Sequence, residues 1–171
     1  LTPELVFGFG RAFPGVRITL VEGHHEQLLK QLRTADIDIA LTYDLVPAND
    51  IAFTSLAQLP PYVMVGEHHS LATQSAVTIQ DLATMPMVLL DMPWSREYFL
   101  GLFSEAGVTP NVVMRSGNME VVRAMVANGV GFGIANVRPK AHLSQDGKRL
   151  IRVRLAGVNR PMQLGYATVA H

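Results

Sequence analysis

The sequence contains no cysteine, and only 16% of its 171 residues are charged. Without cysteine, the chain can form neither a disulfide framework nor a thiolate metal site, and it has no cysteine nucleophile. An apolar share of 49% is sufficient for a large buried core and unlike a disordered segment. Fourteen basic residues balance fourteen acidic ones, so the basic excess typical of a nucleic-acid-binding surface is missing.

Long hydrophobic runs are missing as well. No segment approaches the roughly 20 apolar residues that a membrane-spanning helix needs. The chain opens on Leu1-Thr2-Pro3-Glu4, with neither an initiator Met nor the basic segment of a signal peptide. We therefore expect a piece of a longer cytoplasmic protein that makes no contact with a membrane.

Apolar periodicity divides the chain into alternating helices and strands. Helices are expected over 3–13 and 25–34, in a short segment opened by the capping box Thr78-Ile79-Gln80-Asp81, from an N-cap at Ser95 to Gly107, and from an N-cap at Asn118 to Gly129. Strands are expected over 16–22, 37–42, 51–59, 62–65, 87–90, 112–114 and 133–135, with two more within 150–169. The spacing of 16–22, 25–34 and 37–42 predicts a parallel βαβ unit.

The elements form two blocks, and prolines stand where the chain would pass between them, at Pro60, Pro61 and Pro161. This predicts an α/β fold of two Rossmann-like lobes joined by two crossing strands. Residues 1–59 and 163–171 would form lobe I, and residues 60–162 would form lobe II.

Three stretches carry a resemblance to a known family when they are taken together, in their order and spacing. They run from Pro3-Glu4-Leu5-Val6 to Ile37-Asp38-Ile39-Ala40-Leu41, from Tyr62-Val63-Met64-Val65 to Ile79-Gln80-Asp81-Leu82, and from Val121-Val122-Arg123-Ala124 to Gly131-Phe132-Gly133-Ile134. Together they resemble the effector-binding domain of LysR-type transcriptional regulators.

The resemblance implies a fold like that of type II periplasmic solute-binding proteins, with a small effector bound in the cleft between the lobes. It also implies a homodimer or homotetramer, and DNA binding through an N-terminal winged helix-turn-helix that these residues do not include. The first strand of the family, the loop that follows it and the final helix are likewise expected to be missing. Neither a cofactor nor a metal is implied.

In open α/β sheets, ligands bind beyond the carboxyl ends of the strands. Five strand-end loops of this sequence meet that description, and the resemblance points to the same loops. The first of them begins a helix, whose free N–H groups favour an anion, so the effector is expected to be anionic. The candidate effector-binding residues on these loops are His24, His25, Thr42, Tyr43, Trp94, Ser95, Arg96, Ser116, Asn118, Asn136 and Val137.

Trp94-Ser95-Arg96 is the foremost candidate, because an aromatic wall, a hydroxyl and a guanidinium would suit a planar carboxylate. The alternative is that Trp94 packs against the helix start and Arg96 is solvated. His25 is a candidate hydrogen-bond donor to the ligand, although it could also serve only the fold.

Features of other functional classes are weak. The pairs His24-His25 and His68-His69 lack the spacing of a metal site. Gly129-Val130-Gly131-Phe132-Gly133 closes a helix and opens a strand, the reverse of a nucleotide-binding loop. No nucleophile motif is present, so no catalytic residue is predicted. A free-standing solute-binding protein of a transporter and an enzyme on the same lobes stay as alternatives to the regulatory domain.

Overall fold

We describe the chain from a computed structural model, which describes residues 2–45, 48–158 and 160–170. In chain order the elements are α1 (Thr2–Ala12), α2 (His25–Arg33), β1 (Ala40–Tyr43), β2 (Ile51–Leu59), β3 (Tyr62–Gly66), β4 (Ala76–Val77), α3 (Ile79–Leu82), β5 (Pro86–Leu90), α4 (Ser95–Glu105), β6 (Asn111–Ser116), α5 (Met119–Ala127), β7 (Gly133–Ala135), β8 (Leu150–Leu155) and β9 (Met162–Val169).

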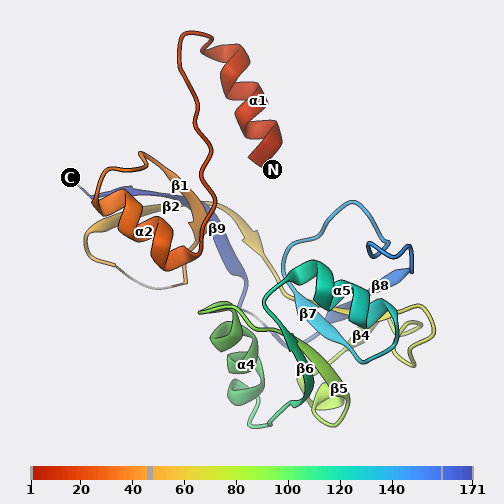
Figure 1. Cartoon of the computed structure of the whole chain (residues 1–171). Coiled ribbons are helices and arrows are strands. Elements are labelled where there is room, and N and C mark those ends of the chain that lie inside the picture. The colour runs from red at the N-terminus through yellow and green to blue at the C-terminus, as the bar shows by residue number, and fades with distance from the viewer. Residues whose placement is uncertain (1, 46–47, 159, 171) are drawn as a thin grey trace.

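One group of elements, called lobe I here, consists of α2 and the sheet β1-β9-β2. Both strand pairs of this sheet are antiparallel, and β9 lies in the middle. The apolar side of α2 packs Leu29 and Leu32 against Ala40 of β1 and Ala167 of β9, which form a small core. Figure 1 shows α2 lying across this sheet.

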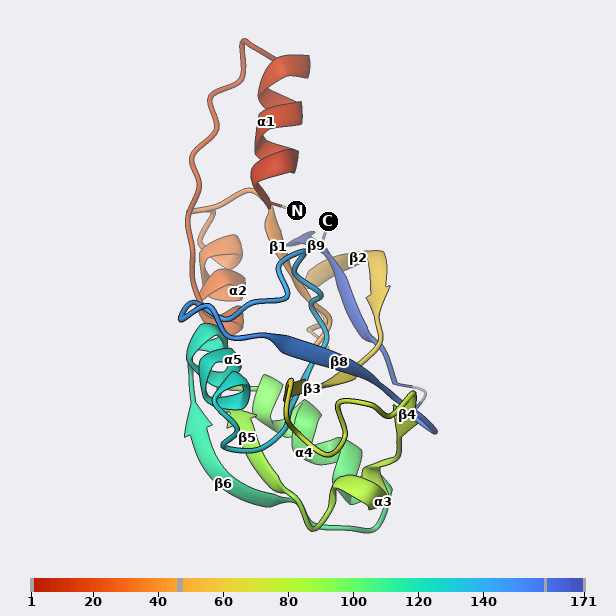
Figure 2. The same cartoon turned by 90° about the vertical axis from the view of Figure 1, so that its right-hand side faces the viewer.

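The second group, called lobe II, contains the sheet β4-β8-β3-β7 and the parallel pair β5-β6. A bridge between Met87 and Phe132 links the two sheets. Helices α4 and α5 add Phe103 and Val126 to a core that is far larger than that of lobe I. Figure 2 shows α3, α4 and α5 around these strands.

Two long passages connect the lobes, as the sequence predicts (Figure 1). The first runs along β2 through Pro60 and Pro61 into β3, and the second runs from β8 past Pro161 into β9. Because β2 and β9 pair over most of their length, the two passages run together as one antiparallel ribbon. The two lobes face each other beside this ribbon, near Met162 and Gln163.

The expected strand over 16–22 is wrong for this structure. These residues run extended and exposed between α1 and α2, so the parallel βαβ unit does not form. A strand needs a neighbour for its backbone hydrogen bonds, and no described strand lies beside Val16, Ile18 and Leu20. Helix α1 forms as predicted, but it projects away from the sheets of both lobes and buries none of its residues (Figure 2).

Three N-terminal caps were predicted, at Thr78, Ser95 and Asn118, and two of them are confirmed. Thr78 and Asp81 form the predicted capping box at α3, and the Asn118 side chain accepts a hydrogen bond from the Glu120 N–H at the start of α5. Ser95, however, is not an N-cap. The capping position of α4 falls on Trp94, whose side chain caps nothing and whose backbone has a φ of 67°.

Candidate functional site

A hollow of about 300 Å³, here called the inter-lobe cavity, lies between the two lobes. It forms where the end of β1 and the start of β9 face the first turn of α4. Lobe I and the crossing ribbon contribute its polar groups Asp44 and Gln163, and lobe II contributes Glu97. Its described lining consists of Asp44, Leu45, Trp94, Glu97, Tyr98, Arg160, Pro161, Met162 and Gln163.

Trp94 joins the lobes directly across this cavity. Its indole Nε1 donates a hydrogen bond of 3.2 Å to Oε1 of Glu26, which lies in the first turn of α2. The positive φ of Trp94 is unfavourable for an aromatic residue, by about 1–3 kcal/mol. Surrounding contacts therefore hold this residue in a strained conformation that turns its indole toward lobe I.

The guanidinium of Arg96 is already paired within lobe II. Its Nη1 lies 2.9 Å from Oδ1 of Asp91, and its Nη2 lies 2.8 Å from Oε1 of Glu97. The hydrogen bond from Arg96 holds the pKa of Glu97 below its ordinary value. Arg96 is consequently a neighbour of the inter-lobe cavity that orients Glu97, and it does not line the cavity.

A buried hydrogen-bond network fixes the floor of the cavity to the crossing passages. The Tyr98 hydroxyl donates to the Arg160 carbonyl at 2.7 Å. The Asn136 amide donates to the Tyr98 hydroxyl at 3.0 Å and to the Leu59 carbonyl at 2.8 Å. Burial raises the pKa of Tyr98, so this phenol stays protonated and able to donate at neutral pH. Asn136 therefore ties α4 to both passages.

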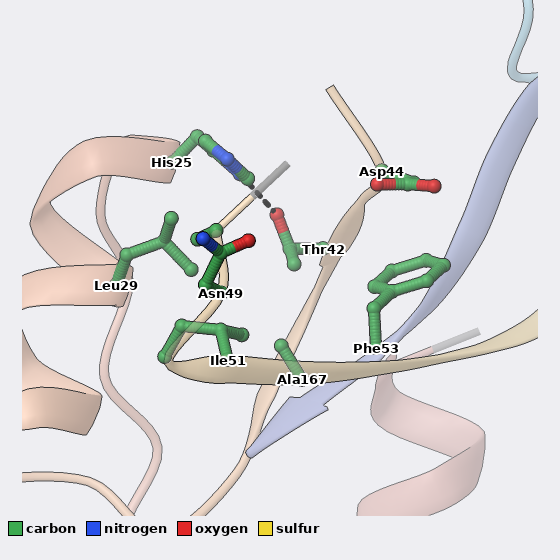
Figure 3. A pocket seen from close by; sticks show the side chains of 9 residues that line it. His25, Leu29, Thr42, Asp44, Asn49, Ile51, Phe53 and Ala167 are labelled. Carbon is green, nitrogen blue, oxygen red and sulfur yellow. Dashed lines mark hydrogen bonds between the residues drawn. The ribbon is translucent and has the colours of Figure 1, made fainter. Parts of the chain in front are cut away.

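A second hollow of about 170 Å³, here called the lobe I pocket, opens between α2 and the sheet of lobe I. His25 and Thr42 meet there, because Nδ1 of His25 and Oγ1 of Thr42 share a hydrogen bond of 3.0 Å (Figure 3). Burial lowers the pKa of His25, so its ring is neutral at pH 7. The described lining consists of His25, Leu29, Thr42, Asp44, Ala48, Asn49, Ile51, Phe53 and Ala167.

The structure brings only some of the predicted residues to these two hollows. Trp94 lines the inter-lobe cavity, whereas His25 and Thr42 line the lobe I pocket. The residues that line neither are His24, Tyr43, Ser95, Arg96, Ser116, Asn118, Asn136 and Val137.

Several of these other residues have local bonding roles. Asn118 caps α5, and its backbone N–H donates to the Ser116 hydroxyl at 3.1 Å. The Val137 carbonyl accepts from the Tyr62 hydroxyl at 2.9 Å.

Sequence reasoning missed most of the lining of the inter-lobe cavity. Asp44 directly follows the predicted residues Thr42 and Tyr43, so its position on the same strand-end loop could have indicated a site residue. Glu97 and Tyr98 stand on the first turn of α4, one and two residues beyond the predicted segment. Arg160 directly precedes Pro161 and Gln163 follows it by two residues, at a crossing that was predicted without a site being assigned to it.

The described ranges contain neither a metal-ligating cluster nor a membrane-spanning helix. Residues 2–45, 48–158 and 160–170 bring together no group of three or more potential metal-ligating side chains. None of the helices found there is long and apolar enough to cross a membrane.

A two-lobed α/β chain with a polar cavity between its lobes has the architecture of a ligand-binding domain. The family model described as the LysR substrate binding domain matches residues 1–170. The chain therefore belongs to the LysR substrate-binding domain family. Its two-lobed α/β fold, predicted from sequence, is the type II periplasmic-binding-protein-like fold of that family.

Three relatives illustrate the likeness. HinK, a LysR family transcriptional regulator from Pseudomonas aeruginosa, is 35% identical and superposes with a TM-score of 0.90 over 98% of this chain and 58% of its own. CysB of Haemophilus influenzae is 27% identical over 85% of this chain and 45% of its own. The effector-binding domain of BenM, solved with its effector benzoate, is 18% identical with a TM-score of 0.82 over 99% of this chain and 77% of its own, and shows the fold alone.

The chain spans about half the length of the curated relatives it matches.

Proposed function

We propose that this chain is the effector-sensing domain of a LysR-type DNA-binding transcription regulator, and that a small molecule binds in its inter-lobe cavity. The observation that carries the proposal is a cavity lined from both lobes in a chain of this family. The relatives are regulators, which favours regulation over transport or catalysis.

Sensing follows from the position of the cavity. A ligand that contacts Gln163 on the ribbon and Glu97 on α4 bridges both lobes, so its affinity depends on how the lobes are arranged. Such a ligand shifts the population toward the arrangement that it binds better. The hydrogen bond from Trp94 to Glu26 is the contact that a bound ligand would reinforce or replace.

The charged side chains that line the cavity bear on which effectors it could bind, and they do not restrict it to anions. Asp44 and Glu97 line it with Arg160 as their only described cationic counterpart, and the Arg160 guanidinium already contacts Glu105. This lining does not support the expectation of an anionic effector, because carboxylates are in excess. The proposal therefore includes neutral and cationic effectors.

In the intact protein we place residues 1–59 and 163–171 in lobe I and residues 60–162 in lobe II. We also propose that the protein is a homodimer or homotetramer, that it acts in the cytoplasm, and that a winged helix-turn-helix elsewhere in the protein contacts DNA. The effector would then act on DNA only by changing the arrangement of these domains.

A ligand screen on the full-length protein tests the function. Thermal shifts against a metabolite library should reveal a compound that, at about a hundred times its Kd, stabilises the fold by about 2.7 kcal/mol. Trp94→Ala and Gln163→Ala should weaken binding of that compound, whereas Gln145→Ala, an exposed site in a turn of lobe II, should not. Unchanged affinity in both cavity variants would exclude the inter-lobe cavity as the effector site.

A further inference from the structure

We propose that the lobe I pocket is a separate small-molecule site, which takes a single-ring compound with a neutral or cationic hydrogen-bond-donating group and disfavours the matching carboxylate. The pocket shares only Asp44 with the inter-lobe cavity among the described lining residues. The inference therefore does not depend on the effector site proposed above.

The size of the pocket sets the size of the ligand. Its volume is about 170 Å³, and an apolar protein cavity of about 150 Å³ is known to hold one benzene molecule. Its inner wall is apolar, with Leu29 on α2, Ile51 and Phe53 on β2, and Ala167 on β9 (Figure 3). One six-membered ring matches both the volume and this wall.

Polar groups gather on the opposite side of the pocket and leave hydrogen bonds to be made. His25 and Thr42 bond to each other, and Figure 3 shows the Asn49 amide beside Thr42, on the side of Leu29, with Asp44 on the other side of Thr42. Neither the Asn49 amide nor the Asp44 carboxylate makes a side-chain hydrogen bond or ion pair with any residue that the structure describes. An apolar wall with a few convergent polar groups is the usual composition of a small-molecule site.

The charge of these groups sets the preference. Asp44 is the one charged side chain in the described lining at neutral pH, because burial keeps the His25 ring neutral. The charged groups that act on His25 are Glu26 and Asp44, both carboxylates. A ligand carboxylate would be repelled there, whereas an ammonium or hydroxyl could donate to Asp44, and the Asn49 carbonyl could accept from the same group.

Three probes of equal ring size test the preference: benzylamine, benzyl alcohol and benzoate, titrated calorimetrically into the full-length protein at pH 7. Benzylamine should bind at least about fivefold more tightly than benzoate, the factor that matches one pair of unit charges about 4 Å apart in water. Asp44→Asn should bring the affinity for benzylamine down to that for benzyl alcohol. Benzoate affinity equal to or above that of benzylamine, or no binding of either, would overturn the proposal.

Two space-filling variants test the location. Ala167→Leu fills the pocket from a buried position on β9, and Ile51→Phe fills it from a half-buried position that tolerates added volume better. Both should weaken benzylamine binding at least tenfold, with Ile51→Phe decisive if Ala167→Leu fails to fold.

The matched controls are Glu97→Gln and Gln163→Ala, which change residues that line the inter-lobe cavity and not the lobe I pocket, and they should leave benzylamine binding unchanged. Loss of binding in these controls, with the pocket variants unaffected, would place the ring in the inter-lobe cavity. That result would overturn this proposal and leave the proposed sensing function intact.

Discussion

At the scale of single residues, Gly165 determines how closely β9 and β2 approach each other. A Cβ at this position would lie 2.1 Å from the Thr54 carbonyl oxygen and 2.5 Å from Cζ of Phe53. Gly165→Ala should therefore force the two strands apart and lower the free energy of unfolding by about 1–3 kcal/mol, the usual effect of overpacking. Urea denaturation measures this change.

Gly8→Ala provides the matched control for Gly165→Ala. Gly8 lies in α1, where an added Cβ meets nothing within 4 Å. This substitution should not lower the urea midpoint, because alanine favours the helix by about 1 kcal/mol relative to glycine. Equal midpoints for the wild type and Gly165→Ala would show that the ribbon has room for a methyl group.

Residue-scale prediction succeeded where the signal is local and failed where the conformation is unusual. Asn118 was predicted correctly as an N-cap, because an asparagine before an apolar helix can by itself accept from one of the free N–H groups at the helix start. Ser95 was predicted in the same way, but the chain turns one residue earlier, at Trp94. A positive φ on tryptophan is imposed by tertiary contacts, so local propensity gives no hint of it.

At the scale of elements, the capping box of α3 makes stability depend on pH. The backbone N–H of Thr78, and then its hydroxyl, donate to the Asp81 carboxylate and hold its pKa below the ordinary value. A carboxyl with a lowered folded pKa stabilises the fold above its unfolded pKa of about 4, and this contribution is lost as the pH falls through the folded pKa.

Asp81→Asn should therefore flatten the loss of stability between about pH 5 and pH 3, as measured by urea denaturation at each pH. The comparison is Asp38→Asn, since the Asp38 carboxylate makes no hydrogen bond to any part of the chain that the structure describes. Identical pH profiles for Asp81→Asn and the wild type would contradict the role assigned to the capping box.

Elements were predicted well from periodicity, except that the short strand β4 was not expected and the strand over 16–22 does not form. Its composition is that of a strand, with Val16, Ile18 and Leu20 in alternation, but pairing is a tertiary property. By contrast β9 has a comparable pattern and forms, because β1 and β2 lie on its two sides. The pattern therefore identifies residues that can form a strand, while the neighbouring strands decide whether one forms.

At the scale of the whole molecule, the two lobes were predictable and the cavity between them was only partly so. Prolines at the block boundaries indicated the crossings, and the family resemblance indicated the cleft. Asp44, Glu97 and Gln163 meet only after the chain has crossed twice, and no sequence spacing relates them. Trp94 could be predicted as a site residue because it is the single tryptophan and follows a strand.

The hydrogen bond between Trp94 and Glu26 should restrict the movement of the lobes relative to each other. Trp94→Phe keeps an aromatic ring and removes the N–H donor, so the lobes should separate more often. Because Glu26 is exposed, the free energy of unfolding should change by no more than about 1 kcal/mol. The effect is therefore expected in the distribution of inter-lobe distances, with little change in the thermal midpoint.

Spin labels on Lys30→Cys in α2 and Ser104→Cys in α4, both exposed positions, measure that distribution in the full-length protein once any other cysteines are replaced. Trp94→Phe should broaden it toward longer distances, and Glu26→Ala should do the same from the other partner. The double variant should add nothing further, since either change alone removes the bond. Distributions that match the wild type would mean that the crossing ribbon alone fixes the lobes.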